Sequence, residues 1–360
     1  MERYYRAALT MVPGIRSSRL GSLVAFFGSA RTAWTAPRRD LFLCPCIDEE
    51  AANNLHNLRE KIDVHNLAAE WEQKGIGVVC QDDGAYPARL RKIFDPPAVL
   101  YYRGRLPRDE LLIAIVGARK ASAYGRNAAT MLATGLAEAG AGVVSGAARG
   151  IDSVAHSGAL DGGGYTVAVL GCGVDVVYPP ENGRLLDRIA EQGAIVSEYW
   201  PGAPPQAQFF PVRNRIISGL ARGVVVVEAA ARSGSLITAD WALEQGRDVF
   251  AVPGSIFAGT SSGANRLLKQ GAKPVTTAAD ILEEYDLTAA AATRPARPEP
   301  AGDEGRVYAL LSCDTPLSAE EIVMKAGLPA PVVTYILLQL VLKDMAAEFG
   351  GQRYVRLPGR

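Results

Sequence analysis

The sequence predicts an α/β protein built around a Rossmann-like, doubly wound and mostly parallel sheet, with a helical domain before it and a winged helix after it. Three observations support this prediction. Short apolar runs alternate with helical stretches in the central part, the residues before 71 have helical spacing, and a proline-rich stretch precedes three further helical segments. We expect a helical domain over 1–71, a connecting segment over 72–110, the Rossmann-like domain over 111–288, a linker over 289–303 and the winged-helix domain over 304–360.

Six runs in the central part are typical of strands that are buried on both faces of a parallel sheet, because they are β-branched, nearly continuous and end in a small residue. They are LLIAIVG (111–117), AGVVS (141–145), YTVAVLG (165–171), GAIVS (193–197), GVVVVEA (223–229) and DVFAVPG (248–254). Helical patterns such as Arg126–Glu138 and Leu236–Gln245 fill the gaps. In such sheets the loops after the strands converge at the carboxyl edge, where ligands bind.

The N-terminal part places Pro13 and Gly14 in a turn, followed by apolar residues such as Leu20 and Leu23 at helical spacing. This hairpin resembles a helix-hairpin-helix or SAM-like unit. Its backbone amides could hold a phosphate, or the unit could be a small bundle that only packs. A single turn favours the second interpretation.

The C-terminal part has three helical stretches and a glycine-turned hairpin, the arrangement of a winged helix-turn-helix. Ser318 and Glu321 form a predicted capping box. The third stretch, 332–342, carries no charge and offers only Thr334, Tyr335 and Gln339 to a DNA groove. Reading bases needs arginine, lysine, asparagine or glutamine, so the composition favours a packing or protein-interaction role over sequence-specific recognition.

Composition limits the classes of function. The 360 residues include 38 Lys plus Arg and 38 Asp plus Glu, so the net charge is zero. This excludes a histone-like binder but not a local basic groove. No apolar run reaches the ~18–20 residues of a membrane span, and Met1–Pro13 lacks the apolar core of a secretory signal. We expect a cytoplasmic protein without membrane contact.

The five cysteines are odd in number and widely scattered, which predicts reduced thiols. Cys44 and Cys46 form a C-P-C without a second pair or a nearby histidine, whereas a tetrahedral zinc site needs about four ligands. We therefore expect no metal.

The loops after the strands carry most of the candidate chemistry. Basic side chains recur there: Arg119, Lys120, Arg149, Arg213, Arg215 and Arg232. IVGARKASAYG, SGAARGIDSVAH and ARSGSLITADWALEQG each place glycine or hydroxyl residues where a helix begins, and FFPVRNRIISGLA places Arg213, Asn214 and Arg215 just before one. Free amides at a helix N-terminus attract anions.

The sequence lacks the complete catalytic and cofactor-binding signatures that its motifs partly match. Gly171 and Gly173 lack the third glycine of a dinucleotide fingerprint, and the chain has no P-loop lysine motif. GTSSG (259–263) lacks the strand before it and the later histidine that a serine-hydrolase elbow requires. Asp152 and His156 share a helix face without a nucleophile, which favours a capping aspartate and a packed histidine. A groove lined for a chain of phosphates, without cofactor or catalyst, fits these loops best.

These motifs, in this order, resemble the DNA-processing protein A family, DprA (also called Smf). The resemblance covers nearly all of 85–285, and it extends to the SAM-like N-terminus and the winged helix. It implies a protein that binds single-stranded DNA and loads RecA recombinase on it during natural transformation and recombination, without enzymatic activity. It also implies a homodimer through the Rossmann-like domain. We place the interface within Gly254–Tyr285, where Leu267, Leu268, Ile281 and Leu282 could form an apolar patch.

The resemblance places Arg119 at the family's Gly-x-Arg position in the DNA pocket. Two departures concern Ala147, where members often have leucine, and Pro180, where some have a DNA-contacting lysine. The expected DNA-binding residues are Gly117, Arg119, Lys120, Gly146, Arg149, Gly150, Asn182, Arg213, Asn214, Arg215, Ser233, Gly234, Ser235 and Thr238.

Two alternatives remain open. The fold also resembles the lysine-decarboxylase-like phosphoribohydrolases that cleave nucleoside monophosphates, but EAAARSGSLITADWALE lacks their PGGxGTxxE signature. A nucleotide-hydrolysis assay distinguishes that class. The third class is a pure interaction scaffold that acts through the winged helix, which deletion of 303–360 would test.

Overall fold

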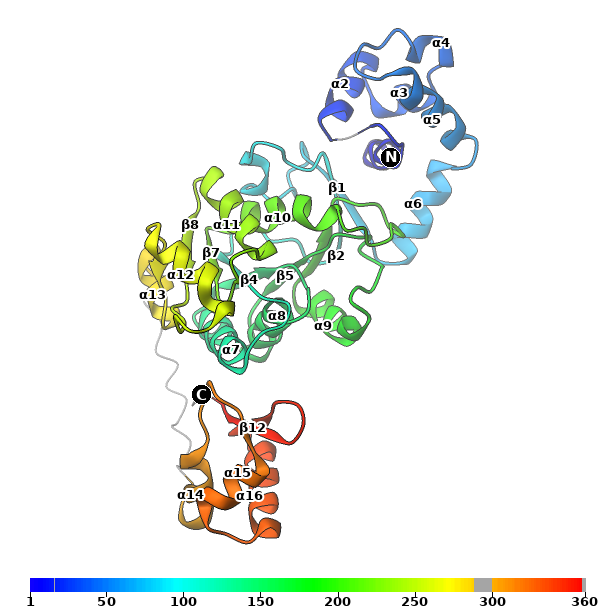
Figure 1. Ribbon diagram of the computed structural model, residues 1–360. Coiled ribbons are helices and arrows are strands. Elements are labelled where there is room, and N and C mark those ends of the chain that lie inside the picture. Colours follow the sequence, from blue (N-terminus) through cyan, green and yellow to red (C-terminus); the bar gives the residue numbers. More distant parts are fainter. Residues whose placement is uncertain (16, 288–299, 358–360) are drawn as a thin grey trace.

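The computed structural model describes residues 1–15, 17–287 and 300–357. A nine-stranded sheet with helices on both faces forms the centre, as the sequence predicts (Figure 1). The six predicted strands are all present. They are β3 (Leu112–Val116), β4 (Gly142–Ser145), β5 (Thr166–Val169), β6 (Ala194–Ser197), β7 (Gly223–Val226) and β8 (Asp248–Ala251).

The strand order is β1-β2-β6-β5-β4-β3-β7-β8-β9, and β6 through β9 run parallel. The chain reverses direction across the sheet between β3 and β7, which is where doubly wound sheets bind ligands. Three further strands lie outside the predicted runs: β1 (Gly77–Cys80), β2 (Val99–Gly104) and β9 (Lys273–Pro274). The first two belong to segment 72–110 and join the β6 edge antiparallel.

Each face of the sheet is covered by its own apolar layer. Helices α7, α8 and α13 pack on one face with Ile113, Ile115 and Phe250, whereas α10, α11 and α12 cover the other. Helix α9 lies near the β6 end (Figure 1). The bounds are α7 (Ala123–Glu138), α8 (Ile151–Asp161), α9 (Gly183–Gln192), α10 (Phe209–Leu220), α11 (Gly234–Glu244), α12 (Ser262–Lys269) and α13 (Ala278–Leu282), with short 3-10 turns at Leu90–Lys92, Pro180–Asn182, Gly259–Ser261 and Glu283–Tyr285.

These layers contradict the expected apolar surface patch within Gly254–Tyr285. Leu267, Ile281 and Leu282 are each at most 5% exposed and belong to the layers over the sheet, so they form no surface patch. The exposed apolar side chains of that region are instead Ile256 and Phe257, at 85% and 93%.

The N-terminal part is helical, and its core continues into the sheet edge. Trp71 contacts the ring of Tyr101 on β2 edge-to-face, and the Tyr101 hydroxyl donates to the carbonyl of Ala7. Arg6 forms an ion pair with Asp82 beyond β1. Strands β1 and β2 therefore serve as the platform for this domain. Its helices are α1 (Glu2–Thr10), α2 (Ser17–Phe27), α3 (Ala30–Thr35), α4 (Arg38–Leu41), α5 (Glu49–Arg59) and α6 (Val64–Gln73).

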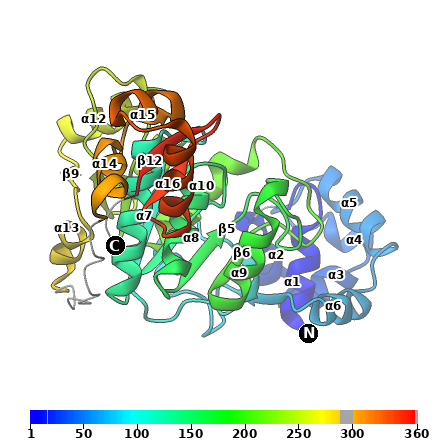
Figure 2. The ribbon, with the colours of Figure 1, turned by 90° about the horizontal axis from the view of Figure 1, so that it is seen from below.

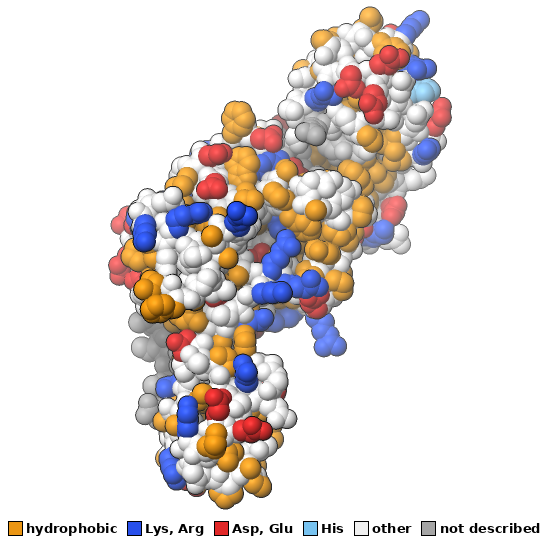
Figure 3. Space-filling model, in the orientation of Figure 1, with side chains coloured by type: hydrophobic (Ala, Val, Ile, Leu, Met, Phe, Trp, Pro, Cys, Tyr) orange, Lys and Arg blue, Asp and Glu red, His pale blue; other side chains and the backbone are white. Residues whose placement is uncertain are grey.

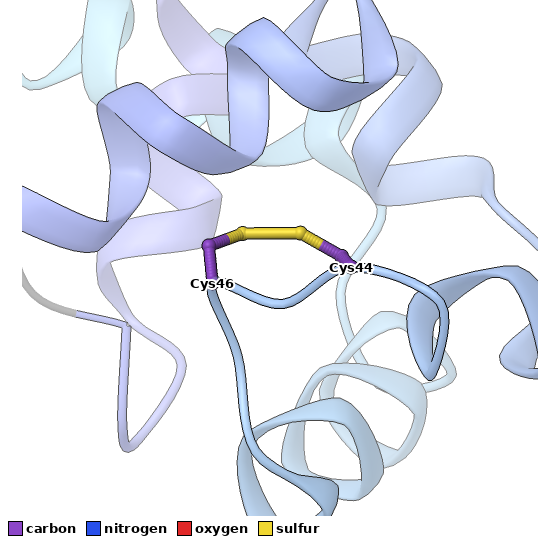
Figure 4. Close-up of a disulfide and its surroundings, with 2 residues drawn as sticks. All are labelled: Cys44 and Cys46. Carbon is purple, nitrogen blue, oxygen red and sulfur yellow. A yellow bond between two sulfur atoms is a disulfide. The ribbon is translucent and has the colours of Figure 1, made fainter.

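A disulfide joins Cys44 and Cys46 in this domain (Figure 4). The expectation that all five cysteines are reduced thiols is therefore wrong for this pair. The single intervening proline leaves the two Cα atoms 5.4 Å apart, within the range that a disulfide spans. The prediction relied on the number and spacing of the cysteines and did not consider how close the two Cα atoms lie. Cys80, Cys172 and Cys313 are free.

The C-terminal part has the winged-helix arrangement that the sequence predicts. Its helices are α14 (Gly302–Leu310), α15 (Ala319–Ala326) and α16 (Ala330–Leu342), and its strands are β10 (Leu317–Ser318), β11 (Ala346–Glu348) and β12 (Arg353–Arg356). The Ser318–Glu321 capping box is confirmed. Most of the predicted linker, 289–303, lies outside the described residues.

Within the described ranges, no single helix is long and apolar enough to span a membrane. Helices α15 and α16 meet the length and composition criteria only as a pair bent by 114°.

Candidate nucleic-acid interface

The loops after β3, β4, β5 and β7 meet at the carboxyl edge of the sheet, as expected for parallel strands. Together with the start of α10 they enclose two adjoining cavities, which we call the carboxyl-edge groove. The larger cavity has a volume of about 320 Å³, and both cavities share Arg119, Ala148 and Phe210. Figure 3 shows several Lys and Arg side chains on the surface of the central domain.

Most predicted site residues line this groove. Gly117, Arg119, Arg213, Asn214, Ser233, Gly234, Ser235 and Thr238 line the larger cavity, and Gly146 and Arg149 line the smaller one. Lys120, Gly150, Asn182 and Arg215 line neither cavity. The structure thus brings together ten of the fourteen predicted positions.

Arg119 is the exposed cation at the junction of the two cavities. Its guanidinium lies 5.6 Å from the ring centroid of Phe210, and it forms no ion pair within the described part of the chain. Lys120 follows it and is also exposed. A phosphate that enters the groove can therefore bind Arg119 without displacing a carboxylate.

Arg149 differs, because its guanidinium faces the Glu181 carboxylate in a two-point contact. This partner raises the pKa of Arg149. Both side chains are at least half exposed, so the pair is weak and exchangeable. Asn182 points inward and donates to the carbonyl of Ala147 at 2.9 Å. It supports the β4 loop rather than facing the groove.

Arg213 lies inside α10, and not before a helix as expected. Pro211 is accommodated in the first turn of a helix, where its missing amide has no partner to lose, so α10 begins at Phe209. Arg213 is 4% exposed, and its guanidinium donates to the carbonyls of Gly146 and Val169, at the ends of β4 and β5. Gly146 is required here, since an added Cβ would lie 2.6 Å from Nη1 of Arg213.

Two buried charges lie beneath the groove. Burial lowers the pKa of Arg213 to about 10, although the nearby Asp152 carboxylate acts to raise it. Burial likewise raises the pKa of Asp152, while Arg213 and two loop amides oppose that shift. The Asp152 carboxylate accepts from the amides of Gly146 and Ala148. It therefore orders the β4 loop, whereas the residue at the N-cap of α8 is Gly150.

Arg215 is a structural residue, and this too differs from the expectation. Its guanidinium pairs with both oxygens of Glu198, at 2.8 and 2.7 Å, and with Asp95 at 3.3 Å. Burial alone would lower the pKa of Arg215, but the two carboxylates outweigh burial and raise it. Two positions along a helix separate it from Arg213, so the two side chains point in different directions.

The N-terminus of α11 faces the larger cavity of the groove and is open to solvent at Gly234. Ser233 caps the helix, and its hydroxyl lies 2.7 Å from that of Ser235. A Cβ on Gly234 would meet nothing within 4 Å, so a phosphate can approach the backbone there. The N-terminus of α7, by contrast, already holds a carboxylate, because Glu228 accepts from the amide of Ser122 at 2.9 Å. The expected anion site after Gly117 is therefore occupied.

Aromatic side chains complete the groove, and these were not among the predicted site residues. Tyr178 and Phe210 line the smaller cavity with their ring centroids 5.4 Å apart. Tyr199 stacks on Phe209 beside them at 4.0 Å. Nucleic-acid bases stack on such rings. The signal in the sequence was the Phe-Phe pair just before the Arg213–Arg215 segment. Among the described residues, no group of three potential metal ligands is present.

Residues 77–286 match the family described as DNA recombination-mediator protein A, and residues 289–352 match the DprA winged helix domain. The chain belongs to the DNA recombination-mediator protein A family. DNA processing protein DprA of Streptococcus pneumoniae is 49% identical over 230 residues, which are 63% of this chain and 79% of that protein.

Solved structures of the same family agree. The crystal structure of DprA from Streptococcus pneumoniae superposes with a TM-score of 0.68 at 37% identity, covering 79% of this chain and 98% of that one. DNA processing protein A from Helicobacter pylori, described for its single-stranded DNA binding mode, gives 0.53 at 29% identity, covering 59% and 97%.

The different environments of Arg119 and Arg215 lead to a prediction. Arg215→Ala leaves the Glu198 carboxylate, whose side chain is only 11% exposed, without its partner, which costs about 3–5 kcal/mol of unfolding free energy. Arg119→Ala removes an exposed side chain and should change stability by less than about 0.5 kcal/mol. Chemical denaturation of both variants measures the two values. Equal stability of the two variants would contradict the assignment of Arg215 as structural.

Proposed function

We propose that the protein binds single-stranded DNA in the carboxyl-edge groove and holds it mainly by its phosphates. The observation that carries this proposal is the position of Arg119, which is exposed and forms no ion pair among the described residues, between two adjoining cavities. The N-terminus of α11 lines the larger cavity, Tyr178 lines the smaller one, and the Phe210 ring lines both. Arginine and amides contact phosphates, while the rings accept any base. The single-stranded DNA bound by the Helicobacter pylori relative supports the same ligand.

Within this proposal the predicted residues have two roles. Arg119, Lys120, Asn214 and the Ser233–Ser235 turn are the contacts to DNA, together with Arg149 once it leaves Glu181. Arg213, Arg215, Asn182 and Gly150 shape the loops. At Gly150 the backbone φ is +80°, and an added Cβ would lie 2.2 Å from the carbonyl of Ala118. Pro180 offers no charge at the rim, so the neighbouring arginines supply it.

Family membership supports the remaining parts of the proposed function. The protein would load RecA recombinase on the bound strand during transformation and recombination, as a cytoplasmic binding protein and not as an enzyme. It would act as a homodimer through the segment Gly254–Tyr285. Because Leu267, Ile281 and Leu282 are buried and Leu268 is half-buried, the exposed Ile256 and Phe257 are the side chains most available for such an interface.

The ligand preference can be measured directly. We expect tighter binding of single-stranded than of double-stranded DNA, with little dependence on sequence, because the groove offers stacking rings and phosphate contacts but no base-reading helix. The logarithm of the affinity should fall with the logarithm of salt concentration, with a slope of about −0.7 per phosphate contacted. Filter binding with both ligands and a mononucleotide tests this. Equal affinity for duplex and single strand would contradict it.

The position of the site can be tested with three variants. Arg119→Ala should weaken binding of single-stranded DNA by about ten- to a hundredfold, since a charge-assisted bond in a crevice contributes about 1.5–3 kcal/mol. Arg353→Ala and Arg356→Ala, in the winged-helix hairpin, should each change it by less than about fivefold. All three are compared on one labelled oligonucleotide at one salt concentration. The reverse order would place the site in the winged helix.

The dimer proposal makes its own prediction. The full chain should be a dimer by light scattering at micromolar concentration, and Phe257→Asp should shift it to monomer, because burying a carboxylate in an apolar contact is costly. Arg31→Asp, on a helix of the N-terminal domain, provides the matched exposed control. A monomeric wild-type chain would refute the interface.

A further inference from the structure

The winged-helix domain lies against helix α7 of the central domain, where both ribbon views place it (Figures 1 and 2). The contact is made by the first two turns of α7 with the β12 end and the loop after α14. This contact belongs neither to the carboxyl-edge groove nor to the segment proposed for dimerisation.

Asn127 is the centre of the contact. Its side-chain amide donates to the carbonyl of Cys313 at 2.6 Å and to the carbonyl of Arg356 at 3.2 Å. Asn127 is only 7% exposed, although it lies on the outer side of α7, because the winged helix covers it. Two carbonyl acceptors require an NH₂ group with two protons, which asparagine has and aspartate lacks.

A second contact involves the neighbouring residue. The Arg126 guanidinium lies 5.7 Å from the ring centroid of Phe349, in the hairpin between β11 and β12. Consecutive residues of α7 therefore hold two different parts of the winged helix, which fixes its orientation as well as its position.

The interface is incompletely filled. Beside Asn127 a cavity of about 290 Å³ opens between the domains, lined by Tyr124, Met131 and Leu132 of α7, by Val252 and Pro253 after β8, and by Cys313 of the winged-helix domain. Tightly packed permanent interfaces leave few voids larger than a water molecule. The contacts named here are the two hydrogen bonds of Asn127 and the cation–π contact of Arg126 with Phe349, and they lie next to a cavity. Such an interface is typical of domains that dissociate and dock again.

We propose that the outer face of α7 is a reversible docking surface for the chain's own winged-helix domain, and that Asn127 is the residue that selects it. The partner surface is the pair of backbone carbonyls at Cys313 and Arg356. In the docked state the winged helix is therefore not an independent module. Release exposes Asn127 and increases the exposure of Cys313, which is half-buried in the docked state.

The thiol of Cys313 provides a probe that needs no added label. Cys80 and Cys172 are buried within the other domains, and Cys44 and Cys46 are joined. The rate at which iodoacetamide alkylates Cys313, followed by mass spectrometry of its peptide, reports the released fraction. Asn127→Asp in the full chain loses both donors and places a carboxylate against two carbonyls. We expect a rise of about tenfold or more in that rate.

Two further variants keep the test decisive. Phe349→Ala removes the second contact from the hairpin and leaves α7 unchanged, so it should raise the rate by a smaller factor even if Asn127→Asp disturbs α7. Asn53→Asp makes the same chemical change on α5 and should leave the rate at the wild-type value. Binding of a short single-stranded oligonucleotide should be unchanged in all of them, which separates this proposal from the function of the groove.

Two results would overturn the proposal. If Cys313 in the wild type already reacts as fast as in the denatured chain, the domains do not dock in solution. If it reacts equally slowly in the wild type, Asn127→Asp and Phe349→Ala, its protection has another source than the contact with α7.

Discussion

The carboxyl-edge groove depends on one buried cation. Arg213 reaches from α10 beneath the groove and donates to the carbonyls that end β4 and β5, while the Asp152 carboxylate balances its charge and holds the β4 loop amides. Without this guanidinium, the two backbone carbonyls would lose its hydrogen bonds and the buried Asp152 carboxylate would lose its balancing charge. The β4 loop, whose residues Gly146–Arg149 line the smaller cavity, therefore depends on this interaction.

The arginines of this region fall into two groups: some stabilise the fold, and others are available to bind a ligand. Arg213 and Arg215 are nearly inaccessible, and their Nη atoms donate to groups within the protein. Arg119 is exposed and forms no hydrogen bond or ion pair within the described part of the chain. The same division applies to helix N-termini. Glu228 already fills the one at α7, and the one at α11 stays open at Gly234. A small number of free donors beside aromatic rings suits an extended strand of phosphates better than a compact charged metabolite.

The sequence predicted the sheet well, because strands buried on both faces are continuous β-branched runs that little else produces. It did not single out β1 and β2, since Val78 and Tyr101 belong to an edge that also carries another domain, and their pattern is shorter and mixed. The groove loops could be found from glycine and arginine spacing. The sequence could not predict whether an arginine faces the groove or the interior, because the helix start at Phe209 and the position of Glu198 are set by tertiary contacts.

Photo-crosslinking tests the central claim most directly. A single-stranded oligonucleotide that carries 5-bromodeoxyuridine is irradiated with the full chain, and the modified residues are identified by mass spectrometry. If the carboxyl-edge groove holds the strand, the adducts fall on its aromatic residues, Phe210 and Tyr178 first, and they disappear in Arg119→Ala at limiting DNA. Adducts confined to the winged helix or to the N-terminal helices, and unaffected by Arg119→Ala, would contradict this account.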